Sequence, residues 1–259
     1  MPTRDHAPHG APCWVDLLTS DADAARAFYT GLLGWEAQEP SEEFGGYFMF
    51  TRDGVPIAGA MPGMPDQPAP SAWTVYLDTD DMDGTLKSST AAGAAVVVGP
   101  MPIADLGSMA VLVDPTGASI GVWQPGSFPG FTVLDEPASP SWFELFTRDH
   151  ARAVDFYGSV FGVATTAVGD SDEFRYTTLL APGTDAELAG IMDASSFLEV
   201  GEAPAWSVYW EVEDTDAALA RVGALGGTVV SEAMDTPYGR MAAAQDPTGA
   251  RFKLRRKPG

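Results

Sequence analysis

The sequence predicts an α+β fold of two tandem domains, each built from two βαβββ modules. The first observation is repetition: Trp-Val-Asp-Leu at residues 14–17 returns as Trp-Phe-Glu-Leu at residues 142–145. The second is a shared turn, Asp-Pro-Thr-Gly, at residues 114–117 and again at residues 246–249. Matches in the same order at nearly constant spacing indicate a duplicated domain of about 130 residues, far longer than a solenoid repeat.

The first module opens with an alternating strand at residues 13–19. Asp21 is the predicted N-cap of the following helix, and Gly34 ends that helix. The apolar stripe of the helix consists of Ala25, Phe28 and Leu32. Two strands, at residues 47–50 and 55–60, complete the module around an Arg-Asp-Gly turn.

The second module restarts the same order after a proline-rich loop at residues 62–70. We expect a strand, a helix and three more strands at residues 73–78, 81–92, 95–98, 109–113 and 119–123. The Asp-Pro-Thr-Gly turn joins the last two strands, with Pro and Gly at the positions that a type I turn favours.

The second copy repeats this pattern, with Asp149 as helix cap and Gly162 as helix end. The segment between the copies is rich in Pro, Gly and Ser, which is typical of a linker. The predicted boundaries are residues 11–125 for the first domain, 126–139 for the linker and 140–256 for the second domain.

The bulk composition excludes several classes of partner. A formal net charge of −22 argues against nucleic acid, because binding phosphates requires a basic face. No apolar run predicts a signal peptide or a membrane span, and the single cysteine, Cys13, excludes an intrachain disulfide framework. We therefore expect a cytoplasmic protein that binds a small molecule, does not bind membranes, and is monomeric because its domain is already duplicated.

The ordered motifs identify a family. Asp21 with Phe-Tyr-x(4)-Gly at residues 28–34 and Asp149 with Phe-Tyr-x(4)-Gly at residues 156–162, together with the two Asp-Pro-Thr-Gly turns, resemble the vicinal oxygen chelate superfamily. This superfamily includes glyoxalase I, bleomycin-resistance proteins, fosfomycin-resistance proteins and extradiol dioxygenases, and the tandem arrangement is similar to an actinobacterial subgroup. The resemblance implies glyoxalase-like domains whose paired modules form a cup-shaped mixed sheet, with the helices outside and the ligand within.

Enzymes of this superfamily hold a divalent metal with His, Glu or Gln on four strands. The resemblance assigns three of these positions in the two copies to Trp14 and Trp142, Thr74 and Ser207, and Gly121 and Lys253. The fourth strand offers no ligand at residues 57–60 and only Glu187 near the matching place. Indole, methylene and ammonium groups do not replace imidazole and carboxylate around a divalent ion. We expect no metal and no other cofactor, since His6 and His9 fall in a predicted tail and His150 follows a surface helix cap.

Strand alternation and the resemblance together place aromatic and polar side chains on the cup faces. The expected ligand-binding residues are Trp14, Tyr76, Trp123, Trp142, Phe146, Ser207, Tyr209 and Lys253. Trp14 and Trp142 either stack on a ligand or fill the space of a lost metal site. Lys253, which has no counterpart in the first copy, either pairs with Glu144, binds an anionic ligand, or extends into solvent. Extra polar groups favour the second copy as the binding copy.

Two carboxylates are the candidate catalytic groups. Burial favours the protonated form of a carboxyl group, so Asp16 and Glu144 are candidates for acid–base catalysis. The alternative is a structural carboxylate bonded to the neighbouring Tyr76 or Tyr209, which we favour because buried charges are normally paired.

The predicted function is metal-independent binding of a small hydrophobic or aromatic molecule in the cups. The alternatives are a lyase- or oxygenase-type enzyme, with acid–base carboxylates or a non-standard metal site, and an interaction module whose cups have collapsed.

Overall fold

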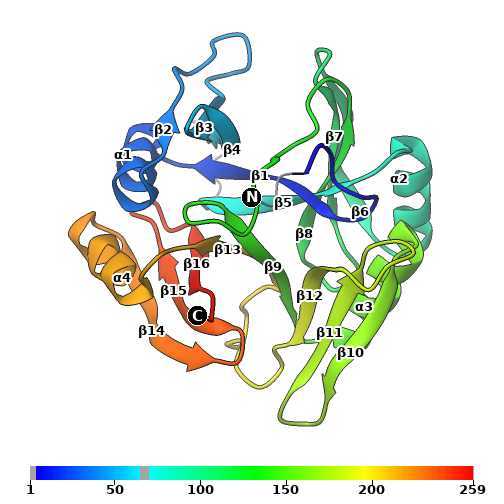
Figure 1. Ribbon diagram of the computed structural model, residues 1–259. Coiled ribbons are helices and arrows are strands. Elements are labelled where there is room, and N and C mark those ends of the chain that lie inside the picture. The colour runs from blue at the N-terminus through cyan, green and yellow to red at the C-terminus, as the bar shows by residue number, and fades with distance from the viewer. Residues whose placement is uncertain (1–3, 65–69, 259) are drawn as a thin grey trace.

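Two eight-stranded sheets, each with two helices, form the protein (Figure 1). The computed structural model describes residues 4–64 and 70–258. The first domain consists of β1 (Pro12–Thr19), α1 (Ala22–Leu33), β2 (Glu36–Ala37), β3 (Phe48–Arg52), β4 (Val55–Pro62), β5 (Ala72–Asp78), α2 (Met82–Ala91), β6 (Ala95–Ile103), β7 (Gly107–Val113) and β8 (Ser119–Pro125).

The second domain repeats this order of elements. It consists of β9 (Pro140–Thr147), α3 (His150–Phe161), β10 (Ala164–Asp170), β11 (Arg175–Leu180), β12 (Glu187–Asp193), β13 (Ala205–Glu211), α4 (Thr215–Ala224), β14 (Thr228–Thr236), β15 (Gly239–Gln245) and β16 (Arg251–Arg256).

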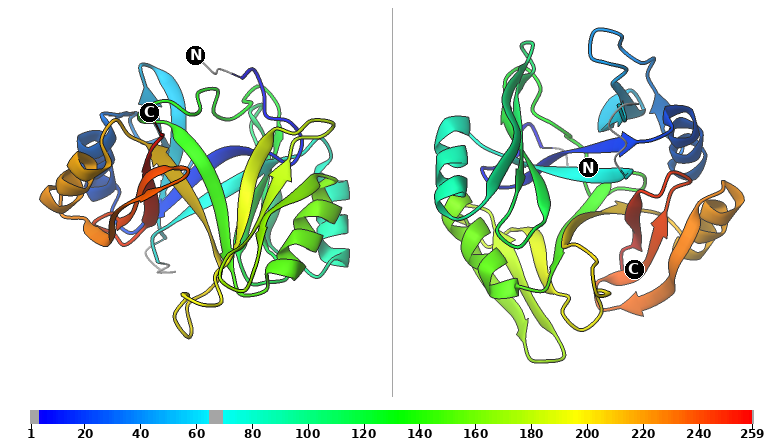
Figure 2. Two further views of the ribbon diagram at one scale, coloured as in Figure 1. Left: turned by 60° about the horizontal axis from the view of Figure 1, so that its bottom comes forward. Right: turned by 180° about the vertical axis from the view of Figure 1, so that it is seen from behind.

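The strand order in each domain is that of two βαβββ modules joined at their first strands. The first sheet runs β2-β3-β4-β1-β5-β8-β7-β6, and the second has the same order with β10 and β14 at its edges. At the centre β1 and β5 pair antiparallel, whereas each pairs in parallel with the last strand of its own module. The predicted α+β fold of two tandem cup-shaped domains is confirmed, with the helices on the outer faces (Figure 2).

The helix signals of the sequence act as predicted. The Asp21 side chain accepts a hydrogen bond of 2.9 Å from the backbone N–H of Ala24, and Gly34 ends α1 in the left-handed region at φ 69°. The predicted strand at residues 95–98 is longer in the structure, where β6 reaches Ile103. The predicted loop at residues 62–70 starts within the end of β4, and its residues 65–69 lie outside the described part of the chain.

The two domains contact each other through their helices and through β5, β8, β13 and β16 of the two sheets. Helix α1 of the first domain contacts α4 of the second, and α2 contacts α3 (Figure 1). Beneath α1, the Tyr29 hydroxyl donates a hydrogen bond of 3.2 Å to Asp246 in the Asp-Pro-Thr-Gly turn of the other domain. Trp73 Nε1 donates to the same hydroxyl at 2.9 Å. A tyrosine of the first domain therefore joins its own sheet to the turn of its neighbour.

The reciprocal contact has the same form. The Tyr157 hydroxyl donates a hydrogen bond of 2.8 Å to Asp114, and Trp206 Nε1 donates to Tyr157 at 2.8 Å. The other oxygen of Asp114 accepts from the backbone N–H groups of residues 116–118, which fixes the turn. These buried partners explain the repeated Phe-Tyr, Trp and Asp-Pro-Thr-Gly motifs, because the motifs hold the two domains together.

No helix in the described ranges is long and apolar enough to span a membrane.

Candidate functional site

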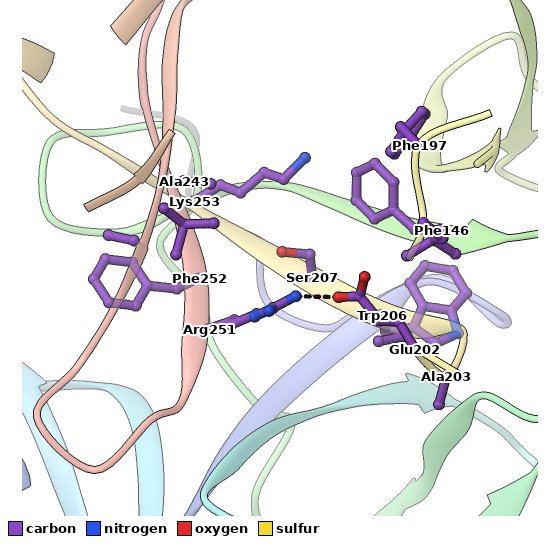
Figure 3. Close-up of a pocket in the computed structure, with 14 residues that line it drawn as sticks. Phe146, Phe197, Glu202, Ala203, Trp206, Ser207, Ala243, Arg251, Phe252 and Lys253 are labelled. Carbon is purple, nitrogen blue, oxygen red and sulfur yellow. Dashed lines mark hydrogen bonds and ion pairs between the residues drawn. The ribbon is translucent and has the colours of Figure 1, made fainter. Parts of the chain in front are cut away.

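A cavity of about 250 Å³ lies in the cup of the second domain (Figure 3). Its walls come from β9, β13, β14, β15 and β16 and from the loop between β12 and β13. The aromatic, polar and charged side chains that line it include Phe146, Phe197, Glu202, Ser207, Arg251 and Lys253. Aromatic walls with a few polar groups are the usual composition of a small-molecule site.

The loop between β12 and β13 forms one wall of this cavity and is held by charged contacts. Glu202 makes an ion pair with Arg251 on β16 (Figure 3). Arg148 donates a hydrogen bond of 2.6 Å to the carbonyl oxygen of Glu202. From the same loop, the Phe197 ring meets the Phe146 ring edge to face, with centroids 6.1 Å apart. The loop thereby completes an aromatic wall that β9 alone does not provide.

Lys253 brings a positive charge to the cavity. Its Nζ lies 3.0 Å from the Tyr209 hydroxyl oxygen, 3.7 Å from a carboxylate oxygen of Glu144 and 3.8 Å from the centre of the Phe146 ring. The Tyr209 hydroxyl in turn donates a hydrogen bond to Glu144. The Lys253 side chain is 25% exposed. Burial lowers the pKa of Lys253, and the neighbouring Glu144 opposes this effect.

Trp142 lies away from this cavity. Its Nε1 donates a hydrogen bond of 2.8 Å to the hydroxyl of Tyr176 on β11, and it lines a separate cavity of about 120 Å³ with Arg4 and Phe143. Gly190 makes room for Tyr176, because a Cβ at that glycine would lie 1.8 Å from the Tyr176 hydroxyl oxygen. We call the hydrogen-bonded groups of Trp142, Glu144, Tyr176 and Tyr209 the polar floor of this cup. Trp142 belongs to it, and the structure does not bring Trp142 together with Phe146.

The polar floor of the first cup has Asp16 in place of Glu144, with Trp14 and Tyr47 in place of Trp142 and Tyr176. Asp16 accepts hydrogen bonds of 2.9 Å from Trp14 Nε1 and 2.9 Å from the Tyr47 hydroxyl. Gly59 makes room for this pair, as Gly190 does in the second domain. Burial raises the pKa of Asp16, and the hydrogen bonds from Tyr47 and Trp14 oppose the rise.

The upper part of the first cup is filled by side chains. The linker places Phe128 edge to face on Trp14 at 4.8 Å, and Trp123 Nε1 donates a hydrogen bond of 3.0 Å to the Phe128 carbonyl oxygen. Tyr76 occupies the space beside Gly121, where a Cβ would lie 2.2 Å from the tyrosine ring. Trp14, Tyr76 and Trp123 are all buried. The packing agrees with the collapsed-cup alternative here, whereas the second cup holds a cavity.

The donors in the two cups do not fit the divalent ion that the fold family uses. The buried carboxylates are Asp16 and Glu144, and tyrosine and indole groups already donate hydrogen bonds to them or to their partners. In the second domain the exposed Glu187 also lines the cavity beside Trp142. Within residues 4–64 and 70–258, one group of three His, Cys, Asp or Glu side chains brings its ligand atoms together. This group, His9, Asp78 and Asp80, includes none of the positions that correspond to the family ligands.

The sequence model of the glyoxalase/bleomycin resistance protein/dioxygenase superfamily matches residues 12–122 and 139–254. The chain belongs to this superfamily. A relative of similar length is the putative glyoxylase CFP32 of Mycobacterium tuberculosis, which is 36% identical over 98% of this chain and 97% of its own. The anthracycline biosynthesis protein DnrV of Streptomyces peucetius is 38% identical over 95% of this chain and 92% of its own.

Solved structures of the superfamily share the fold at low sequence identity. The Mn(II)-bound glyoxalase of Novosphingobium aromaticivorans superposes with a TM-score of 0.67 at 18% identity, covering 96% of this chain and 82% of the other. The 2,3-dioxygenase LapB of Pseudomonas sp. KL28 gives 0.65 at 14% identity, covering 98% and 94%. These similarities show the superfamily architecture.

Phe146, Ser207 and Lys253 line the main cavity, and Tyr209 contacts it through Lys253. The catalytic candidates Asp16 and Glu144 lie in different sheets, so they do not form one site. Four residues around the cups carried no clear signal in the sequence: Tyr47, Phe128, Tyr176 and Phe197. The placement of His9 in a tail is wrong, because the backbone N–H of Gly10 donates a hydrogen bond of 2.9 Å to the carbonyl oxygen of Asp78.

Proposed function

We propose that the protein binds a flat aromatic molecule bearing an acidic oxygen in the cup of its second domain. The observation that carries this proposal is the cavity of about 250 Å³ with the Lys253 ammonium group at its wall. A preformed concave site with aromatic walls and one fixed charge selects both the shape and the polarity of a ligand.

The chemistry of the walls supports an aromatic ligand. Phe146 and Phe197 present ring surfaces, and Lys253 is held beside them by Tyr209 and Glu144. A phenolate or carboxylate oxygen would receive a charge-assisted hydrogen bond from the lysine. Two relatives are named for anthracycline biosynthesis, and hydroxylated quinones are flat molecules with acidic phenols. We therefore propose hydroxyquinone-like compounds as the ligand class.

Binding in this proposal requires no metal. The carboxylate of each cup is engaged by tyrosine or tryptophan donors, and the position that corresponds to the last family ligand carries the ammonium group of Lys253 in the second cup. A lysine cation at that place repels a divalent ion but attracts an anionic ligand.

The test is a titration of alizarin, a dihydroxyanthraquinone, into EDTA-treated protein by isothermal titration calorimetry. We expect one saturable site, with binding weakened at least about tenfold in Lys253→Met and partly retained in Lys253→Arg. Lys87→Met is the matched control because Lys87 is exposed on α2, far from the cup in sequence and fold. Equal binding by wild type and Lys253→Met, or saturable binding only after a metal is added, would contradict the proposal.

A second candidate is an acid–base enzyme of the same superfamily, of the lyase or oxygenase type. The Glu144–Tyr209–Lys253 chain favours it, since hydrogen bonds connect a buried carboxylate to a lysine at the cavity wall. In this case Glu144→Gln would abolish turnover of a bound compound and leave its binding within about threefold. Product analysis by mass spectrometry, with and without Glu144→Gln, separates an enzyme from a binding protein.

We also propose that the protein is a cytoplasmic monomer. The contacts of α1 with α4 and of α2 with α3 already cover the inner helix faces within one chain. Light scattering coupled to size-exclusion chromatography measures the mass in solution directly.

A further inference from the structure

A cluster of three possible metal ligands lies where the chain enters the first domain. The backbone N–H of Asp78, the last residue of β5, donates a hydrogen bond of 2.9 Å to the carbonyl oxygen of Ala11. Gly10 turns the chain in the left-handed region at φ 77°, and a Cβ there would come within 2.7 Å of Val163. The close packing at Gly10 fixes His9 beside the end of β5.

The ligand atoms of His9, Asp78 and Asp80 lie within 4.8 Å of one another. His9 Nδ1 is 4.0 Å from an oxygen of Asp80. The residues differ in freedom, because Asp78 is 2% exposed whereas the Asp80 side chain is 86% exposed. A buried acid, a partly buried imidazole and an exposed acid thus lie around one point.

Two of these ligand atoms are buried without a partner. Neither Asp78 Oδ1 nor His9 Nδ1 has a hydrogen-bond partner in the part of the chain that the structure describes. Buried polar atoms are almost always satisfied, and an unpaired buried oxygen costs free energy. Burial and the neighbouring Asp80 raise the pKa of Asp78 to about 7. A cation placed between Asp78 Oδ1 and His9 Nδ1 would satisfy both atoms.

In the second domain, the carboxylate at the position equivalent to Asp78 has hydrogen-bond partners. Glu211 ends β13 as Asp78 ends β5, and its oxygens accept hydrogen bonds from Arg255 Nε at 3.2 Å and from the backbone N–H of Lys257 at 2.8 Å. In the first domain the residue that pairs with Asp78 on the neighbouring strand is Trp123, which brings no charge.

In the first domain Arg4 lies near Asp78, but it does not pair with Asp78 as Arg255 pairs with Glu211. The Arg4 guanidinium lowers the pKa of Asp78, but its Nε and Nη2 donate to the backbone carbonyl oxygens of Phe131 and Pro12. Of the two equivalent carboxylates, only the one in the second domain is bonded to an arginine.

We propose that His9, Asp78 and Asp80 bind a divalent transition-metal cation such as Zn²⁺. One imidazole and two carboxylates are a ligand set that zinc accepts, and a fourth position stays open for water. Ligand atoms of a tetrahedral zinc site lie about 3.3 Å apart. Binding would therefore draw the Asp80 side chain toward the other two groups. This side chain is exposed, so it has room to move. The cation would tie the N-terminal segment to β5.

Zinc titration of the full, untagged chain after EDTA treatment tests the proposal. We expect one equivalent bound by isothermal titration calorimetry and a raised Tm. His9→Gln and Asp80→Asn should each weaken binding at least about tenfold. Asp80→Asn is a surface change and His9→Gln alters a partly buried side chain, so circular dichroism checks the fold of both variants. His6→Gln is the matched control, since His6 is an exposed histidine of the same segment.

Cobalt provides an independent readout, because Co²⁺ bound through an imidazole nitrogen changes its visible absorption, and this change should be absent in His9→Gln. The proposal is overturned if the wild type binds no more Zn²⁺ than a His9→Gln/Asp80→Asn double variant. It is equally overturned if binding survives His9→Gln unchanged or is lost in His6→Gln.

Discussion

The two cups have the same floor and different contents. In the first cup Asp16 accepts hydrogen bonds from Trp14 and Tyr47. In the second, Glu144 accepts from Tyr209 and Trp142 donates to Tyr176, and in each cup a glycine makes room for one tyrosine. Above the floor, the first cup is packed with Phe128 from the linker, whereas the second holds a cavity beside Lys253. The residues that the copies share serve the scaffold, and the residues that differ decide whether a ligand has room.

The largest expected effect concerns the shared scaffold. Asp114→Ala and Asp246→Ala should each lower the free energy of unfolding by about 3–4 kcal/mol, because each removes a buried carboxylate that fixes a turn and accepts a hydrogen bond from the other domain. Urea unfolding followed by circular dichroism measures both. A loss in only one variant would show that the two turns are not equivalent.

The next effect compares the unfolding free energies of variants at one equivalent wall position in the two cups. Gly121→Ala should cost about 2–3 kcal/mol, because its Cβ would meet the Tyr76 ring at 2.2 Å. At the equivalent position, Lys253→Met should cost about 1 kcal/mol, because a side chain is already accommodated there and Tyr209 still bonds Glu144, although the cation beside Glu144 is lost. Equal unfolding free energies for the two variants would argue that the first cup is as open as the second.

A pH effect distinguishes Asp78 from its counterpart Glu211. In EDTA, the folded-state pKa of Asp78, about 7, lies above the unfolded value of 3.8. The folded state therefore binds the proton more tightly, and stability falls as the pH rises from about 4 through 7. Between pH 5 and 8 this amounts to about 2.5 kcal/mol, given 1.36 kcal/mol per pKa unit.

Asp78→Asn removes this titration, so its Tm should fall less than that of the wild type over the same pH range. Glu211→Gln is the comparison, because Glu211 is paired with Arg255. Identical pH profiles for the wild type and Asp78→Asn would contradict the prediction.

The smallest effect concerns the ligand. Phe146→Ala should weaken alizarin binding about tenfold, equivalent to 1.4 kcal/mol, because it removes an aromatic wall of the cavity. Leu18→Ala, at the equivalent place in the first cup, should leave the affinity unchanged. Calorimetric titration of both variants decides which cup is occupied, and weakening by Leu18→Ala alone would move the site to the first domain.

The sequence predicted the scaffold because local signals and repetition agree there. The helix cap Asp21, the helix end Gly34 and the Asp-Pro-Thr-Gly turns act on residues nearby in the chain, so their effect can be inferred without a structure. Repetition also marked Tyr29 and Tyr157, which lie at the domain interface. Their partners in the other domain were not predictable, because nothing in the sequence specifies which helices pack together.

The site was predicted only in part, for a physical reason. Strand alternation placed Phe146, Ser207 and Lys253 on one face, and the structure brings all three to one cavity. The loop residue Phe197 and the linker residue Phe128 were missed, because loops follow no periodicity. The sequence therefore did not predict that Phe128 of the linker would pack on Trp14 in the first cup.

The reciprocal tyrosine contacts have a consequence for ancestry. When residue i of one copy meets residue j of the other, and j meets i, the surface is that of a two-fold symmetric homodimer. The chain preserves such an interface inside one polypeptide, with the linker fixing a one-to-one ratio of halves. Because the halves are joined in one chain, they can differ in the cup, where Phe128 packs on Trp14 in one and Lys253 lines a cavity in the other, while the interface contacts stay the same. Separately produced halves should therefore reassemble into a heterodimer.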